Sequence, residues 1–226
     1  VAEFDLLIMP IGGNRMKKEK GFILYKGASL IDGKPIIVIA TMKTNNPKTG
    51  DMVQTWIMRE DIAPHLAVKN GDDISVCGDC IHRPALGNTC YVTTFQAPLS
   101  VWKSYHNGNY SSDLTQLKRL LPKRKLRIGA YGDPAACPTS VWAELATLSM
   151  GNTGYTHQWE RPEFDPDLLD YVMASVDTEK KAKSIGARYF RVIPIGGKPL
   201  SKEIECLSDS MGKSCADCLL CDGGNK

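Results

Sequence analysis

The chain has 226 residues, of which 42% are hydrophobic and 23% charged, and its formal net charge is +3. This length allows one substantial hydrophobic core. The net charge is too small to indicate by itself which partner the protein binds. No apolar run approaches the roughly 20 residues that a membrane-spanning helix needs. The opening VAEFDLLIMP lacks the features of a signal peptide, so we expect a soluble, cytoplasmic protein with no membrane partner.

The first part of the chain, residues 1–111, is predicted to be rich in β-strands. Runs of β-branched and aromatic residues at 21–27, 34–42 and 52–58 are separated by turn-forming segments, which is typical of consecutive β-hairpins. Short helices are expected at 59–71 and 97–108. The first cysteine motif lies between these two helices.

Residues 112–200 are predicted to alternate between helices and strands. We expect helices at 112–122, 137–149 and 178–186, strands at 125–133, 153–160 and 187–196, and a short apolar segment at 167–177. Such alternation is typical of parallel βα units. The predicted fold class is therefore α/β, a partial (βα) barrel or parallel sheet preceded by β-hairpins. Residues 201–226 follow as a cysteine-rich metal-binding tail of what we expect to be one globular domain.

Seven of the eight cysteines fall into two groups, and such clustering is typical of metal ligation in a compartment that keeps thiols reduced. The eighth, Cys137, stands alone and is expected to be a small, buried apolar side chain. The first group contains Cys77, Cys80 and Cys90, and the terminal group contains Cys206, Cys215, Cys218 and Cys221.

The terminal group has the spacing C-x8-C-x2-C-x2-C. Overlapping C-x2-C pairs are typical of ferredoxin-like runs, in which each thiolate binds a different iron of a [4Fe-4S] cluster. Zinc is the alternative ligand. Four thiolates close the coordination sphere of either centre, so the sequence indicates a structural or electron-transfer role for this group.

The first group supplies only three cysteines. His82, two residues beyond Cys80, and His157, far along the chain, are the two candidates for a fourth ligand. With either histidine, the group would be a structural Cys3His zinc site. Without them, it would be a centre with one open position, the arrangement that catalysis needs.

Polar residues follow three predicted strands. Asp133, His157, Gln158 and Asp177 stand where carboxyl ends of parallel strands would bring them to one edge of the sheet, so we predict that they form a catalytic site. Each has a simpler interpretation. Asp133 can open a turn before Pro134, Asp177 can cap the helix that begins near Glu179, and His157 can be a core histidine.

Residues 118–127 hold six basic side chains and no acidic one. Such a segment attracts nucleic-acid phosphates, although a solvated helix end has the same composition. Trp102, Tyr105 and Tyr110 are candidates for stacking on bases. The basic residues are Lys118, Arg119, Lys123, Arg124, Lys125 and Arg127.

Several segments together resemble an uncharacterised family of phage-encoded and bacterial proteins, which would place the chain in a host cytoplasm. They are NPKTGDMVQTWI, VCGDCIHRP, TCYV, RIGAYGDPAACP, GYTHQW, VMASVD and CADCLLC. More distantly, the first cysteine group and the GDP strand are similar to radical S-adenosylmethionine barrels, a group that includes spore photoproduct lyase. This resemblance implies a partial α/β barrel with a three-cysteine site near its mouth and a second cysteine site at the C-terminus.

The first group differs from those barrels in its spacing, C-x2-C-x9-C in place of their C-x3-C-x2-C. The loop after Cys80 must therefore fold back before Cys90 can reach the same metal. Arg83 and Asn88 on this loop would then lie near a bound ligand.

Two functions follow as hypotheses. The first is an iron–sulfur, radical S-adenosylmethionine-like enzyme that acts on a small molecule or a nucleic-acid base. The second is a zinc-stabilised nucleic-acid-binding protein without catalytic activity. A zinc hydrolase that uses Asp133 and His157 is a third, minor option, since no H-E-x-x-H motif is present.

Overall fold

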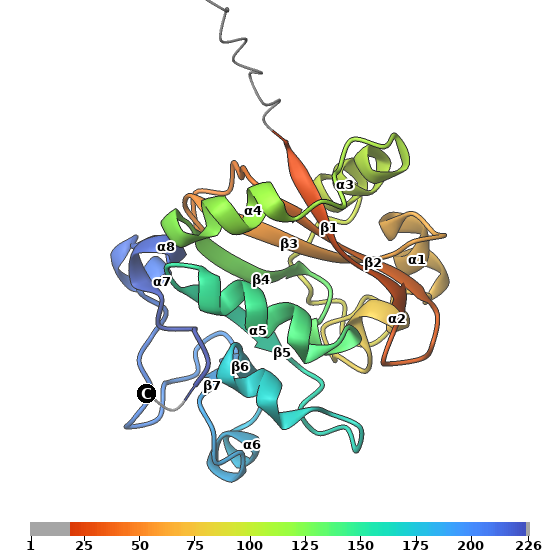
Figure 1. Cartoon of the computed structure of the whole chain (residues 1–226). Helices are drawn as coiled ribbons and strands as arrows, with labels where there is room; N and C mark the ends of the chain where they lie inside the picture. The colour runs from red at the N-terminus through yellow and green to blue at the C-terminus, as the bar shows by residue number, and fades with distance from the viewer. Residues whose placement is uncertain (1–18, 225–226) are drawn as a thin grey trace, which may run out of the picture.

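Seven strands, ordered β1 to β7 along the chain, form the sheet that organises this mixed α/β fold (Figure 1). The computed structural model describes residues 19–224, so the opening segment interpreted above as lacking a signal peptide lies outside the described residues. The strands are β1 (Gly21–Ala28), β2 (Pro35–Thr41), β3 (Met52–Arg59), β4 (Lys125–Tyr131), β5 (Asn152–Thr156), β6 (Met173–Val176) and β7 (Tyr189–Arg191).

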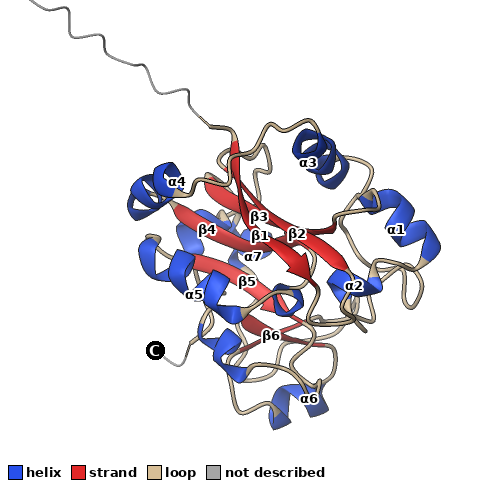
Figure 2. Cartoon of the chain, turned by 45° about the vertical axis from the view of Figure 1, so that its right-hand side comes forward, coloured by secondary structure: helices blue, strands red, loops and turns tan. Residues whose placement is uncertain are grey.

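Helices fill the connections between the strands and follow the last of them (Figure 2). The α-helices are α1 (Pro64–Asn70), α2 (Ile74–Cys77), α3 (Ala97–His106), α4 (Thr115–Leu120), α5 (Thr139–Leu148), α6 (Glu179–Ser184), α7 (Leu207–Met211) and α8 (Cys215–Cys218). Short 3-10 helices are η1 (Leu121–Lys123), η2 (Pro134–Ala136) and η3 (Pro166–Asp170).

The first three strands are antiparallel, as the predicted hairpins require. Strand β2 lies between β1 and β3, and its residues 36–41 are all buried. This explains why its sequence, PIIVIAT, is continuously apolar and does not alternate with polar residues: both faces of the strand are covered.

From β3 onward the strands are parallel. The chain passes from β3 to β4 through residues 60–124, which contain the first cysteine group and helices α1 to α4. Later crossovers are short. The predicted alternation of helices and strands is therefore confirmed at the level of an α/β sheet with parallel βα units.

Helices α4 and α5 cover the same face of the sheet (Figure 1). Their apolar residues pack into one core with β4, whose Leu126 and Ile128 are fully buried. The residues that the helices and η1 contribute are Leu117, Leu121, Trp142 and Leu145. Cys137, just before α5, is 1% exposed in this core, which confirms the prediction that it is a packing residue.

The opposite face of β4 carries a buried charge. Arg127 lies between Leu126 and Ile128 in the strand, so its side chain projects from the other face. Its guanidinium lies over the ring of Tyr155 on β5, 4.8 Å from the ring centroid. This face therefore has a polar and aromatic character, unlike the face covered by α4 and α5.

The cysteine-rich tail returns to the sheet and lies beside the amino-terminal ends of the parallel strands. The backbone N–H groups of Cys215 and Ala216 donate to the carbonyl oxygens of Lys48 and Thr49, which precede β3, at 2.8 and 3.0 Å. The N–H of Gly154 on β5 donates to the carbonyl of Cys221 at 3.0 Å. Figure 1 shows α7 and α8 at one end of the sheet and α2 at the other.

Some element ends differ from the predicted ones for identifiable reasons. Helix α1 begins only at Pro64, because proline fits the first turn of a helix and not its interior. Strand β5 ends at Thr156, so His157 follows the strand and does not lie within it. There the backbone N–H of His157 donates to the carboxylate of Asp133 at 2.7 Å instead of continuing the β-ladder.

No helix in the described part of the chain combines the length and the apolar character that a bilayer span requires.

Candidate metal and substrate site

The carboxylate of Asp133 joins the ends of β4 and β5. One oxygen accepts a hydrogen bond from the hydroxyl of Thr156 at 2.7 Å and another from the N–H of Ala135 at 3.0 Å, while the second oxygen accepts from the N–H of His157. Burial raises the pKa of Asp133 to about 6, against the opposing effect of these hydrogen bonds. Asp133 thus opens a turn, as its simpler interpretation held, and also connects two strand ends.

Asp177 follows β6, and its interpretation as a helix cap is wrong. Thr178 is the N-cap of α6, and its side chain accepts the hydrogen bond from the N–H of Lys181 at 3.2 Å. The Asp177 carboxylate is therefore directed elsewhere, and its Oδ1 lies 3.1 Å from Nε2 of His82. The sequence did not indicate this contact, because 95 residues separate the two side chains.

His157 and His82 lie edge to face, with ring centroids 5.3 Å apart. Together with Asp177 they form a group in which one potential ligand atom from each residue lies within 4.8 Å of the others. Nε2 of His157 is buried and has no hydrogen-bond partner. Burial lowers the pKa of His157 to about 4, so the ring is neutral at pH 7 and can act as a ligand.

Gln158 packs against the first cysteine loop. Its side-chain amide donates to the carbonyl of Cys77 at 3.0 Å. The loop approaches so closely at Gly78 that an added Cβ would lie 1.9 Å from Oε1 of Gln158, and Gly78 has a φ of +56°. Gln158 therefore shapes the loop around the cysteines. It does not line the surface cavity that lies beside this loop and is described below.

The thiols of the first group lie close enough to influence one another. Burial is the main cause that raises the pKa of Cys77 well above its usual value and that of Cys80 to about 11, and the negative charge of Cys90 adds to both shifts. At neutral pH these thiols are protonated in the absence of a metal, so they are poor nucleophiles. Deprotonation by a bound metal is the chemistry that suits them.

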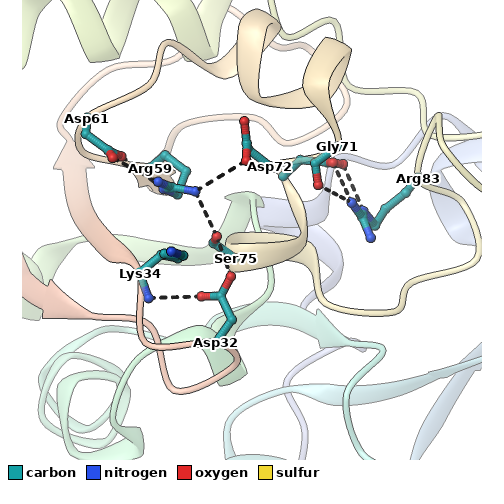
Figure 3. Close-up of polar contacts among 9 residues, drawn as sticks. Asp32, Lys34, Arg59, Asp61, Gly71, Asp72, Ser75 and Arg83 are labelled. Atoms are coloured by element: carbon teal, nitrogen blue, oxygen red, sulfur yellow. Dashed lines mark hydrogen bonds and ion pairs between the residues drawn. The ribbon is translucent and has the colours of Figure 1, made fainter.

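A buried ion pair holds this loop in place. The guanidinium of Arg83 donates from Nε and Nη2 to both carboxylate oxygens of Asp73, at 2.9 and 2.6 Å. The same guanidinium donates to the carbonyl of Gly78 at 2.8 Å. It also donates to the carbonyl of Gly71 at 3.0 Å (Figure 3). The donors of Arg83 are thus directed at the loop itself, and its position near a bound ligand stays a prediction.

The loop folds back, as its spacing predicted. The carbonyl of His82 accepts hydrogen bonds from the N–H groups of Thr89 and Cys90, at 3.2 and 2.9 Å. Asn88 makes the turn with a φ of +49°, a conformation that asparagine tolerates better than most residues. Cys90 is thereby returned to the neighbourhood of Cys80.

A surface cavity of about 480 Å³ adjoins the first cysteine group. Its wall is formed by the loop between Cys80 and Cys90 and by residues that follow β6 and β7. The volume falls within the usual range for small-molecule sites. The lining residues are Ile81, His82, Leu86, Gly87, Thr89, Asp177, Val192 and Pro194.

The terminal cysteines also lie within electrostatic range of one another. Burial raises the pKa of Cys215 and of Cys221, and the charge of Cys206 adds to both shifts. The positive charge of Arg127 opposes the shift at both thiols. The fold therefore brings this group together beside a buried cation at the amino-terminal edge of the sheet.

Arg127 is 6% exposed, and none of the ion pairs among the described residues involves it. Its hydrogen bonds go to the hydroxyls of Thr153 and Tyr91, both at 3.5 Å, the long limit for such a contact. A buried guanidinium is costly unless a negative charge balances it. Cys215 and Cys221 lie within electrostatic range of this guanidinium and could supply that charge once deprotonated.

The basic segment is largely occupied by internal contacts. Lys118 pairs with Glu144, Arg124 pairs with Asp51 at 2.7 Å, and Lys125 donates to the carbonyl of Ala216 at 2.5 Å. Arg127 is buried and so lies outside any nucleic-acid-binding surface. Arg119 and Lys123 are exposed and take part in none of the ion pairs found among residues 19–224.

The aromatic residues proposed for base stacking serve the fold. Trp102 donates to the carbonyl of Arg59 at 3.0 Å, and Tyr105 donates to the carboxylate of Glu60 at 2.8 Å. Both rings, with that of Tyr110, pack against the core. They therefore do not form an exposed stacking platform.

Comparisons with protein-family models, with curated proteins and with solved structures found no match to this chain. The interpretation of the site accordingly rests on the chain's own geometry.

We predict that Gly78→Ala disturbs the first cysteine loop. The added methyl would collide with Gln158, and the positive φ would be strained, so the free energy of unfolding should fall by more than about 1 kcal/mol. Denaturant unfolding measures this loss. Gly71→Ala is the matched control, because Gly71 also has a positive φ but nothing lies within 4 Å of an added Cβ. Equal losses in the two variants would contradict the proposed contact with Gln158.

Proposed function

We propose that this chain is an iron–sulfur protein and that its first cysteine group is the catalytic centre of a radical S-adenosylmethionine-like enzyme. One observation carries the proposal. In the described residues, His82, His157 and Asp177 are the one group of three potential ligands whose ligand atoms all lie within 4.8 Å, and no cysteine belongs to it. Among residues 19–224, no three cysteine ligand atoms lie that close together.

A zinc ion and a [4Fe-4S] cluster hold their thiolate ligands at different separations. Four thiolates around one zinc ion at about 2.3 Å lie about 3.8 Å apart. In a [4Fe-4S] cluster each thiolate binds a different iron, so the sulfurs are spread more widely. The absence of three close cysteine sulfurs among the described residues agrees with the larger centre. Protonated, half-buried thiols such as Cys77 and Cys80 suit either metal and do not distinguish between them.

The first group supports a catalytic role through its position. Cys77, Cys80 and Cys90 would hold a cluster and leave one iron without a cysteine ligand. The group lies at the carboxyl edge of the parallel strands, where ligands bind in open α/β sheets and in barrels. With S-adenosylmethionine bound, such a cluster would supply one-electron chemistry.

The chain's own residues have distinct parts in this proposal. Asp177 lines the adjoining cavity and is the candidate for direct contact with a small molecule or a flipped base. Asp133 and Gln158 are positioning residues, because their hydrogen bonds fix the strand ends and the cysteine loop. The partial barrel of the resembling family fits the sequential strand order and is part of the proposal.

The terminal group would hold a second, closed cluster. Four cysteines complete its ligand set, and Arg127 would balance part of the negative charge of the cluster. This charge balance supports an anionic metal–thiolate centre of either metal. A cluster there would stabilise the tail and could relay electrons.

We predict that S-adenosylmethionine binds the first cluster through its open iron. Its addition to the reduced protein should change the electron paramagnetic resonance spectrum, because a ligand on that iron alters the electronic structure of the cluster. Cys90→Ser should abolish the response. Cys137→Ala, which removes a thiol outside both groups, should retain it. A spectrum that S-adenosylmethionine leaves unchanged, in a protein that carries both clusters, would reject the radical mechanism.

The alternative, a zinc-stabilised nucleic-acid-binding protein, predicts a different salt dependence. Arg119 and Lys123 are the exposed cations of the basic segment that lie outside the ion pairs of residues 19–224. Two cations release few counterions, so the logarithm of the binding constant should fall with the logarithm of salt concentration with a slope of about 1.8. Six phosphate contacts would give a slope of about 5.4. We expect weak binding with the shallow slope, lost in an Arg119→Glu and Lys123→Glu variant. A steep slope in the parent protein would favour the alternative function.

A further inference from the structure

We propose that His82, His157 and Asp177 bind one divalent transition-metal ion at a site separate from both cysteine groups. Two imidazoles and one carboxylate are the donors of the facial triad that is typical of non-haem iron(II) sites, and the same donors suit zinc, manganese and cobalt. This site goes beyond the proposed iron–sulfur function and does not depend on it.

The three side chains come from separate parts of the chain and meet at one edge of the sheet. His82 belongs to the loop between the first cysteines, His157 follows β5, and Asp177 follows β6. Nε2 of His82 lies 3.1 Å from Oδ1 of Asp177, and the ring of His157 lies edge-on to that of His82. Their ligand atoms lie within 4.8 Å of one another, so the three side chains could hold one metal ion.

The unpartnered nitrogen of His157 is an independent observation that points to a ligand. Buried polar atoms almost always have a hydrogen-bond partner, and each exception requires an explanation. Nε2 of His157 is buried without one. A metal ion between His157 and the His82–Asp177 pair would occupy this nitrogen and remove the exception.

The surroundings of His82 are those of a metal ligand. Its second ring nitrogen, Nδ1, lies 2.6 Å from the hydroxyl of Thr89. Metal-binding histidines usually form such a contact through the nitrogen that does not bind the metal, and it fixes the orientation of the ring. Thr89 is thus a positioning residue for the proposed site.

The cavity specifies the class of molecule that would bind beside the ion. Three protein ligands leave coordination positions open, and His82 and Asp177 both line the cavity of about 480 Å³. Its other walls include Ile81, Leu86 and Val192, which are apolar side chains exposed to solvent. The fitting ligand is a small molecule with an oxygen donor for the metal and an apolar body.

The donor set also separates this site from the cysteines. Nitrogen and oxygen donors give cobalt(II) a weak spectrum, whereas thiolate ligands add intense charge-transfer absorption, because sulfur is the softer donor. Cobalt(II) therefore reports both whether an ion binds and which residues hold it.

The test is titration of the full chain with cobalt(II), after its iron, sulfide and zinc contents have been measured. We expect one ion to bind without thiolate charge-transfer absorption. His157→Ala and Asp177→Asn should each weaken binding by more than about 100-fold, and Thr89→Val by about 10-fold to 100-fold. His106→Ala is the matched control, since His106 lies on α3 outside the triad. It should bind cobalt(II) as the parent does.

Three results would overturn the proposal. They are the absence of bound cobalt(II), binding that survives in Asp177→Asn and in His157→Ala, and thiolate charge-transfer absorption that Cys80→Ser removes. If His157→Ala does not fold, the Asp177→Asn variant alone tests the proposal, because asparagine has nearly the same size as aspartate. Failure of the iron–sulfur proposal gives a different result, namely a chain without sulfide whose cobalt(II) binding still depends on Asp177.

Discussion

The candidate site depends on the interactions of Asp133 at the end of β4. The backbone N–H of this residue donates to the carbonyl of Val76 at 2.6 Å, directly before the first cysteine. Its carboxylate accepts from the hydroxyl of Thr156 and the N–H of His157. One residue thus connects the cysteine loop, β4 and β5, and it does so from a buried position, where each unmade hydrogen bond would be costly. Loss of these contacts would separate the cysteines from the histidine that the fold brings to them.

The two cysteine groups lie at opposite ends of the strands of the same sheet. Different interactions hold each group in place. The first is fixed by Arg83, whose ion pair and backbone contacts hold the loop before any metal binds. The terminal group is tied to the sheet mainly by backbone hydrogen bonds of residues 215, 216 and 221. Arg127 reaches toward both, since it acts on the terminal thiols and contacts Tyr91, the residue after Cys90.

The sequence predicted the parts of this structure that follow from local pattern. The alternation of apolar runs indicated the βα units, and the carboxyl ends of the strands indicated that Asp133, His157 and Asp177 would approach one another. The sequence did not predict which side chains would meet across turns or between distant parts of the chain. The contact between His82 and Asp177 joins residues with no shared pattern, and the role of Arg83 depends on Asp73 lying across a turn. The composition of residues 118–127 also suggested more exposed cations than the structure has. Arg127 is buried because it lies in β4, where alternate residues face opposite sides of the sheet.

We propose that both cysteine groups hold iron–sulfur clusters and not zinc ions. Iron and acid-labile sulfide analysis of the anaerobically purified chain tests it most directly. The account predicts roughly eight iron and eight sulfide per chain for two [4Fe-4S] clusters, and about half of each in Cys218→Ser, which breaks only the terminal ligand set. Iron bound by the histidine site would add to the iron but not to the sulfide. Stoichiometric zinc at the cysteines with no sulfide would contradict the account.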